Sequence, residues 1–141
     1  MTEGLRIRIV DPGDDYLGIE IQVSNGRFAG STRIFAGLEQ LTEFSAKIAG
    51  FPTNPDDERI YESGSRESKI AGGYGRMRFH CIDHKGHAAI EVILEDDDKY
   101  YSAASARLSL QVEAADIDRF IKRLRVLQKE RSGEAVLSSS V

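Results

Sequence analysis

The stretch that decides the fold is RMRFHCIDHKGHAAIEVIL, residues 76–94. Apolar and polar residues alternate in both halves of this stretch, and residues 83–86 (DHKG) lie between the halves. Such alternation is typical of half-buried strands, and glycine suits the left-handed position of a short turn. The stretch therefore predicts a β-hairpin with one apolar and one polar face.

The same pattern predicts the register of this hairpin. If Ile82 and His87 close the turn, apolar or small side chains face one another along both strands, and Arg78 faces Glu91. A slip by one residue would set Phe79 against Glu91 and move the apolar residues to the other face. The register with Arg78 opposite Glu91 is therefore the one we expect.

Further strands are expected on both sides of the hairpin. Residues 5–10 alternate apolar and basic side chains, and residues 16–24 and 27–35 flank Asn25-Gly26, a strong signal for a two-residue turn. This turn would pair Ser24 with Arg27 and Ile19 with Thr32. Residues 58–71 are ambiguous, with short strands near residues 59–62 and 67–71 as one interpretation.

One long strand is expected over residues 100–113, after a charged turn at residues 95–99. A turn of that length pairs Leu94 with Tyr100, and continuing the register predicts the pairs Glu91–Ala103, Ala89–Ser105 and His87–Arg107.

Two segments have helical spacing instead. Apolar residues recur every three or four positions over residues 38–49 and over residues 116–130, where Asp116 can cap the helix. The predicted class is α+β: one antiparallel sheet of six to seven strands, in the order βββ-α-ββββ-α, with both helices on one face. Residues 1–131 would form a single domain, and residues 132–141 a disordered polar tail.

Composition excludes some classes of function. The 141 residues carry a net charge of −4, which disfavours nucleic acid as a partner. A single cysteine excludes an intrachain disulfide. No basic segment with an apolar run begins the chain and no stretch approaches 18 apolar residues, so we expect a cytoplasmic protein that does not bind membranes.

The polar side of the central strands is the candidate site. In the predicted register it carries the following residues, grouped around the small residues Ala89, Ala103 and Ser105: Arg78, His80, His87, Glu91, Tyr101, Ser105 and Arg107. Arginine and aromatic side chains dominate binding hot spots. The alternative is an ordinary solvated face of an antiparallel sheet.

Catalytic and metal chemistry are disfavoured by the same register. Ser105 and His80 would lie two strands apart, about 9–10 Å, too far for a nucleophile and its base. The three histidines do not have the spacing of a zinc site, and Cys81 falls on the apolar face, where a thiol is inert. The glycines at residues 72–75 precede a strand rather than a helix, so they form no phosphate cradle. We therefore expect no catalytic residue, metal or cofactor.

The second half of the chain resembles an uncharacterised family of small bacterial proteins. The residues that carry the resemblance are the turn DHKGH at 83–87, an aromatic-Ser-Ala element at 101–103, the strand LSL at 108–110, the YES element at 61–63 and the closing amphipathic helix. The resemblance covers about residues 58–130. It implies a compact α+β domain without known activity, and some such proteins resemble immunity proteins that neutralise toxins.

Three functions follow as hypotheses. The first is a non-enzymatic, immunity-like protein that binds a protein partner through the polar face, and the acidic balance of the chain suits a basic partner. The second is a small-molecule binder or weak hydrolase that uses His80, Glu91 and Tyr101 in a pocket over Ala89 and Ala103. The third is a homo-oligomer joined through this face or a sheet edge.

Overall fold

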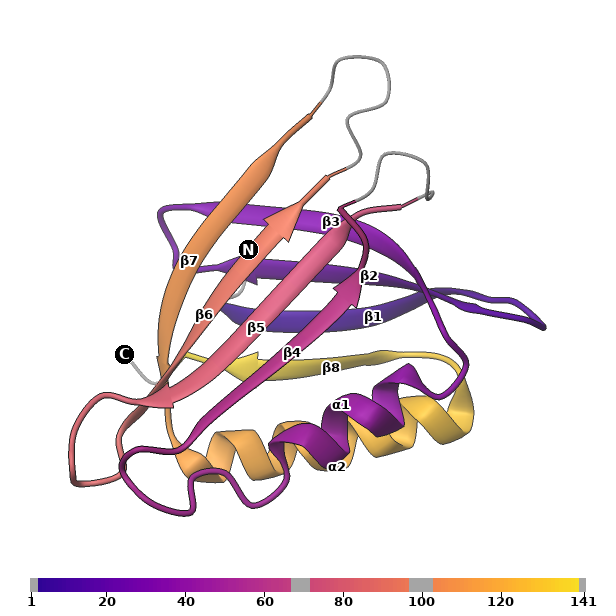
Figure 1. Cartoon of the computed structure of the whole chain (residues 1–141). Helices are drawn as coiled ribbons and strands as arrows, with labels where there is room; N and C mark the ends of the chain where they lie inside the picture. Colours follow the sequence, from indigo (N-terminus) through magenta and orange to yellow (C-terminus); the bar gives the residue numbers. More distant parts are fainter. Residues whose placement is uncertain (1–2, 67–71, 97–102, 140–141) are drawn as a thin grey trace.

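The computed structural model describes residues 3–66, 72–96 and 103–139, which form an α+β fold (Figure 1). The elements in chain order are β1 (Gly4–Pro12), β2 (Leu17–Ser24), β3 (Ala29–Ala36), α1 (Gln40–Ile48), β4 (Glu58–Gly64), β5 (Tyr74–Cys81), β6 (Ala88–Glu95), β7 (Ser105–Val112), α2 (Ala114–Glu130) and β8 (Glu134–Ser138). Neither described helix is long and apolar enough to cross a bilayer.

The strands form two antiparallel four-stranded sheets, so the expectation of a single six- to seven-stranded sheet is wrong. The first sheet has the order β3-β2-β1-β8 and the second has the order β4-β5-β6-β7. Strand β3 crosses the strands of the second sheet, and Figure 1 shows the two sets of strands running at a large angle to each other. Each sheet has one apolar face, and stacking the two faces buries both at once. The helices then cover only the open end between the sheets.

A single hydrophobic core joins both sheets and both helices. Phe44 of α1 stacks on Tyr61 of β4 with ring centroids 4.6 Å apart, and its ring also lies 6.2 Å from Phe79 and 5.8 Å from Phe120. The apolar stripes predicted for the two helices point into this core. Asp116 is the third residue of α2 rather than its cap, and its carboxylate accepts a hydrogen bond from the Glu113 N–H at 3.4 Å.

Residues 134–138 form strand β8, contrary to the expectation of a disordered tail from residue 132. Strand β8 pairs with β1, with Leu137 opposite Leu5 and Ala135 opposite Ile7. Both Ala135 and Leu137 are fully buried. The apolar residues of this short segment sit at alternate positions, and β1 offers an edge that would otherwise be unpaired.

The register of the central hairpin is as predicted. Arg78 lies opposite Glu91, Phe79 lies opposite Ile90, and the Ile82 N–H donates to the His87 carbonyl at 2.9 Å. Apolar side chains on one face only leave this hairpin a single register that buries them.

The register predicted for β2 and β3 is wrong by two residues. Ser24 pairs with Ala29 and Ile19 with Ile34, because the turn places Asn25 opposite Phe28 instead of at its centre. The Asn25 side chain accepts hydrogen bonds from the N–H groups of Arg27 and Phe28, which explains the shift. A shift of two residues leaves each side chain on the face of the sheet that was predicted for it, although Phe28 lies beyond the sheet and is 66% exposed.

The register predicted for β7 is wrong by six residues. Ala89 lies opposite Gln111 instead of Ser105, and Arg107 lies opposite Ile93 instead of His87. The connection is longer than the expected turn, since β6 ends at Glu95 and β7 begins at Ser105; residues 97–102 lie outside the described residues. Because six is an even number, Ser105 and Arg107 still point to the predicted face.

Candidate functional site

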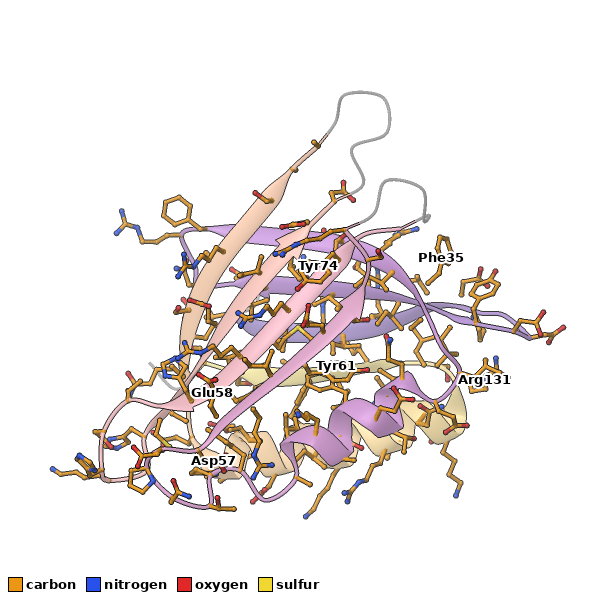
Figure 2. The ribbon with its side chains drawn as sticks, viewed as in Figure 1. Phe35, Asp57, Glu58, Tyr61, Tyr74 and Arg131 are labelled. Carbon is orange, nitrogen blue, oxygen red and sulfur yellow. The ribbon has the colours of Figure 1, made fainter. Side chains whose placement is uncertain are left out.

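The outward side of the second sheet is the candidate site, and we call it the polar face. It consists of alternate residues of four strands: Glu58, Ile60 and Glu62 of β4; Tyr74, Arg76, Arg78 and His80 of β5; Ala89, Glu91, Ile93 and Glu95 of β6; and Ser105, Arg107, Ser109 and Gln111 of β7. Figure 2 shows Glu58 and Tyr74 toward opposite ends of this sheet. The intervening residues of the same strands point into the core.

Glu91 is the centre of the polar face. Its carboxylate accepts a 2.8 Å hydrogen bond from Arg107 of β7 and lies 3.6 Å from the guanidinium of Arg76 on β5. The Glu91 side chain is only 15% exposed, whereas that of Arg107 is 73% exposed. The hydrogen bond from Arg107 and the charges of Arg107, Arg78 and Arg76 lower the pKa of Glu91 despite its partial burial. A carboxyl group with a lowered pKa is a poor general acid.

Two further side chains of β5 on this face bind carboxylates of β4. Arg78 donates to Glu58 of β4 at 2.7 Å, and the Tyr74 hydroxyl donates to Glu62 at 2.5 Å. Burial, together with this bond to Glu62, raises the pKa of Tyr74 to about 12. The Arg66 guanidinium lies over the Tyr74 ring, 4.3 Å from its centroid. The polar face is therefore a network of ion pairs that holds its arginines in fixed positions.

The two candidate histidines have different surroundings. His80 lies on the face opposite Ala89, and its side chain makes no hydrogen bond or ion pair within the described residues. His87 lies just before β6, where its Nδ1 atom is 2.5 Å from the Asp83 carboxylate. The hydrogen bond to Asp83 raises the pKa of His87 and lowers that of Asp83. His87 therefore holds the turn together, while His80 remains available to a ligand.

The structure brings together only part of the predicted set. Arg78, His80, Glu91 and Arg107 share the polar face, whereas Ser105 lies at its far end opposite Glu95. Tyr101 lies outside the described residues. Ala103 is described but belongs to no strand, so Ala89 is flanked by Gln111 and not by a patch of small residues. This difference follows from the longer connection between β6 and β7.

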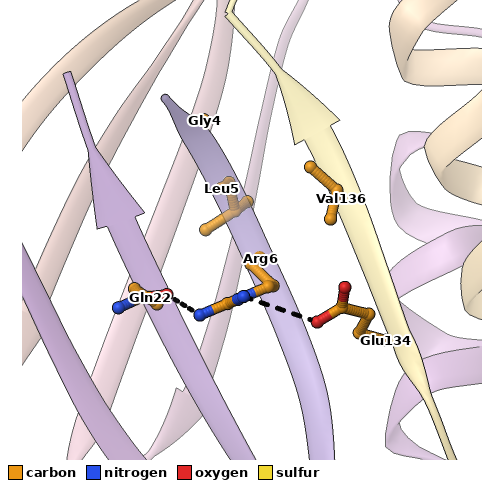
Figure 3. A pocket seen from close by; sticks show the side chains of 6 residues that line it. All are labelled: Gly4, Leu5, Arg6, Gln22, Glu134 and Val136. Atoms are coloured by element: carbon orange, nitrogen blue, oxygen red, sulfur yellow. Dashed lines mark hydrogen bonds and ion pairs between the residues drawn. The ribbon is translucent and has the colours of Figure 1, made fainter. Parts of the chain in front are cut away.

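Three hollows formed by described residues lie away from Ala89. One is a groove of ≈ 440 Å³ between the turn at residues 25–29 and residues 105–109 of β7. Another, of ≈ 270 Å³, lies between the end of α1 and the outer side of α2. A third, of only ≈ 50 Å³, lies on the first sheet, where Arg6 binds both Gln22 and Glu134 (Figure 3).

The geometry offers no catalytic constellation among the described residues. Ser105 lies opposite Glu95, which in turn lies opposite Tyr74 of β5. Tyr74 is six residues from His80 along β5, so the backbones of Ser105 and His80 are about 20 Å apart. No three His, Cys, Asp or Glu side chains in the described ranges gather closely enough to hold a metal. Burial, with the nearby Asp57 and Asp83 carboxylates, raises the pKa of Cys81, which keeps its thiol protonated and unreactive.

The short strand expected near residues 59–62 is confirmed as β4, but its contribution to the polar face was not predicted. Glu58 and Glu62 bind Arg78 and Tyr74, and Ile60 lies opposite Arg78 on the polar face. Alternation within residues 58–63 was the available signal, since Glu58, Ile60 and Glu62 are separated by Arg59 and Tyr61. The preceding loop obscured that signal.

A comparison with models of protein families found no match for this chain. Comparisons with curated proteins and with solved structures found no match either. The resemblance to small bacterial proteins therefore stays a prediction, and the function must be argued from the polar face itself.

Proposed function

We propose that this chain is a non-enzymatic binding protein whose polar face contacts a protein partner. The observation that carries the proposal is the cluster of three arginines, Arg76, Arg78 and Arg107, arranged around Glu91. Arginine is enriched among the residues that dominate binding energy. Their carboxylate partners already fix these side chains, which reduces the entropy lost on binding.

The apolar residues of the face support the same proposal. Ile60 and Ile93 are half-buried and lie next to the arginines, so the surface alternates charged and apolar contacts. The Arg78 and Arg76 side chains are 31% and 27% exposed, which leaves their guanidinium edges in reach of a partner. A mixture of this kind is typical of protein interfaces.

Charge acts at two distances in this proposal. The net charge of −4 attracts a basic protein from afar, as the immunity-like hypothesis requires of a toxin. At contact, the partner would meet Arg76, Arg78 and Arg107 around the Glu91 carboxylate at the centre of the face, whereas the other carboxylates of the face, those of Glu58, Glu62 and Glu95, lie toward its edges. The partner should therefore place carboxylate or carbonyl oxygens at the centre of the interface.

Exchange of the arginines tests the proposal. The double variant Arg78→Gln/Arg107→Gln should lose at least one protein that co-purifies with the wild-type chain from the cells that produce it. The control is Arg8→Gln/Arg33→Gln, because these two arginines flank Glu20 on the first sheet at 2.9 and 3.6 Å. Retention of every co-purifying protein by the first variant, or equal losses from both variants, would reject the polar face as the binding surface.

A further inference from the structure

Within residues 3–66, 72–96 and 103–139, strand β7 is an open edge of the second sheet. It pairs with β6 on one side, and on its other side residues 105–109 line the ≈ 440 Å³ groove together with Asn25, Phe28 and Ala29. An open edge offers unpaired N–H and C=O groups to another chain, and proteins usually block it. The features that protect the other edge strands are therefore the standard against which β7 is compared.

The other three edge strands each make a hydrogen bond to a neighbouring element. On β8, Arg123 of α2 donates to the Glu134 carbonyl at 2.9 and 3.2 Å. On β3, the Arg33 carbonyl accepts a hydrogen bond from the Gly73 N–H at 2.7 Å. Strand β4 lies against α1, and the Tyr61 hydroxyl donates to the Gln40 carbonyl at 3.0 Å.

β7 has none of the protective features that edge strands carry. Its sequence, SARLSLQV over residues 105–112, contains no proline or lysine, and its pairing with β6 has no bulge. Its only charged side chain, Arg107, is bonded to Glu91 and so does not shield the edge. A long, regular edge with a single charged side chain is open to the addition of another strand.

The groove beside this edge defines which side chains an added strand must carry. Successive residues of a strand point to opposite faces. On the inner side the added strand would meet Phe28, Ala106 and Leu108, and on the outer side it would meet Arg107. The inner positions therefore suit apolar side chains, and the outer position suits a carboxylate.

A second copy of the chain is a poorer occupant. A two-fold pairing centred on the groove would set Arg107 opposite the Arg107 of the other copy and would bring both Arg27 side chains nearby. Like charges directly opposite destabilise a strand pair. Within the described residues the Arg27 side chain has no carboxylate partner to offset this repulsion.

We propose that the edge of β7 accepts an extended segment of a partner protein as an added strand, with apolar residues against Phe28 and an acidic residue at Arg107. This inference rests on the proposed function and names the part of the partner that the chain contacts. The segment would extend the second sheet to five strands, continuous with the polar face.

The first test uses a displayed library of random twelve-residue peptides, selected on the immobilised full-length chain. Enriched peptides should alternate apolar residues with residues that include Asp or Glu. The best peptide should bind Phe28→Ser about tenfold more weakly, which corresponds to about 1.4 kcal/mol. Phe35→Ser is the matched control, because Phe35 is a 57% exposed phenylalanine on β3, the strand that follows Phe28, but does not line the groove, and this variant should bind the peptide normally.

Amide chemical shifts of the labelled chain locate the contact. Adding the peptide should shift the backbone N–H signals of residues 105–109, and a peptide N-methylated at alternate residues should lose binding. Peptides without alternation, or binding that survives both Phe28→Ser and N-methylation, would overturn the proposal. Shifts at residues 105–109 that depend on protein concentration without peptide would assign the edge to a second copy instead.

The two proposals fail separately. If peptides do not bind the edge while Arg78→Gln/Arg107→Gln still loses its protein partner, the polar face stands and the added strand is wrong. If the peptides bind as expected while that double variant keeps every partner, the edge is a strand acceptor and the polar face is not the interface.

Discussion

Arg59 ties the start of β4 to the end of α1. Its guanidinium donates to the Asp57 carboxylate at 2.9 Å, and to the carbonyls of Lys47 and Ala49 at 3.0 and 3.1 Å. It therefore binds the last carbonyls of α1, where a positive charge is favourable. The hydrogen bonds from Arg59 lower the pKa of Asp57 to about 2.

Replacing Arg59 should destabilise the fold. Arg59→Met removes the partners of two helix carbonyls and of a carboxylate that is 10% exposed, so we expect a loss of about 1–3 kcal/mol in urea unfolding. Arg33→Met, which removes a 70% exposed side chain from a 3.6 Å pair, should change the free energy of unfolding by less than about 0.5 kcal/mol. Equal effects in the two variants would show that Arg59 has no special structural role.

The same pair predicts a dependence on acid. Because folding lowers the pKa of Asp57 from its ordinary 3.8 to about 2, its contribution to stability is present above pH 4 and is lost as the pH falls toward 2. Urea unfolding of the wild type between pH 4 and pH 2 should show this loss. In Arg59→Met the part of the slope that belongs to Asp57 should shrink, because only the hydrogen bonds from Thr53 then lower the pKa of Asp57. An unchanged slope would contradict the assignment.

Glu91 permits a direct test of the arginine cluster. Its pKa is lowered chiefly by the hydrogen bond from Arg107, so Arg107→Gln should raise the pKa of Glu91 toward its ordinary value. Carbon NMR of the Glu91 carboxyl group, followed during acid titration, measures this pKa. Arg27→Gln on the neighbouring turn is the control and should leave the titration unchanged.

The two sheets meet at a junction between β3 and the start of β5. The Gly73 N–H donates to the Arg33 carbonyl, and the Thr32 hydroxyl donates to the Glu95 carbonyl at 3.0 Å. A Cβ atom on Gly73 would lie 1.8 Å from the Thr32 hydroxyl oxygen and 2.6 Å from the Glu95 carbonyl oxygen. Only glycine permits this close approach of one sheet to the other.

Gly73→Ala should therefore cost about 1–3 kcal/mol of stability, because the crowding forces the two sheets apart. The matched control is Gly37→Ala, where the new methyl group would meet nothing within 4 Å. Its effect on the free energy of unfolding should stay within about 0.5 kcal/mol. Thermal unfolding of both variants measures the difference, and a neutral Gly73→Ala would contradict the junction.

Local patterns predicted the individual strands and helices better than their assembly. The central hairpin has a single apolar face, and its register follows from that face alone. The register of β7 could not be predicted, because nine residues, 96–104, connect β6 and β7 where a five-residue turn was expected. The charged side chains of the two strands did not distinguish the two registers. In the turn between β2 and β3, the hydrogen bonds that the Asn25 side chain accepts set the register. The Asn25-Gly26 pair fits a turn centred on residues 25 and 26 as well as one in which Asn25 lies opposite Phe28, so the sequence did not distinguish the two registers.

The complete molecule depends on contacts that no local pattern shows. Two separate sheets and one sheet of seven strands have the same alternation along each strand, so the sequence could not distinguish them. The polar face was predicted in its central part, Arg78, His80, Glu91 and Arg107, because a shift of an even number of residues preserves the face. Its β4 side and the open edge of β7 depend on the order of the strands in space.

β8 also joins the two ends of the chain. A variant that ends at Gly133 loses Ala135 and Leu137 from the core and leaves β1 unpaired, so we expect at least about 3 kcal/mol less stability. A variant that ends at Ser138 keeps the whole strand and should unfold like the wild type. Thermal unfolding of the two truncated chains compares them, and similar midpoints would show that β8 is dispensable.

The central claim is that the polar face meets a protein partner, and photo-crosslinking in the producing cell tests it most directly. A photoreactive amino acid at Ser109 would lie exposed on the polar face, and the same residue at Ser31 would lie exposed on the outer side of the first sheet. We predict a discrete crosslinked protein from position 109 and none from position 31. No crosslink at position 109, or the same crosslinks from both positions, would contradict the account.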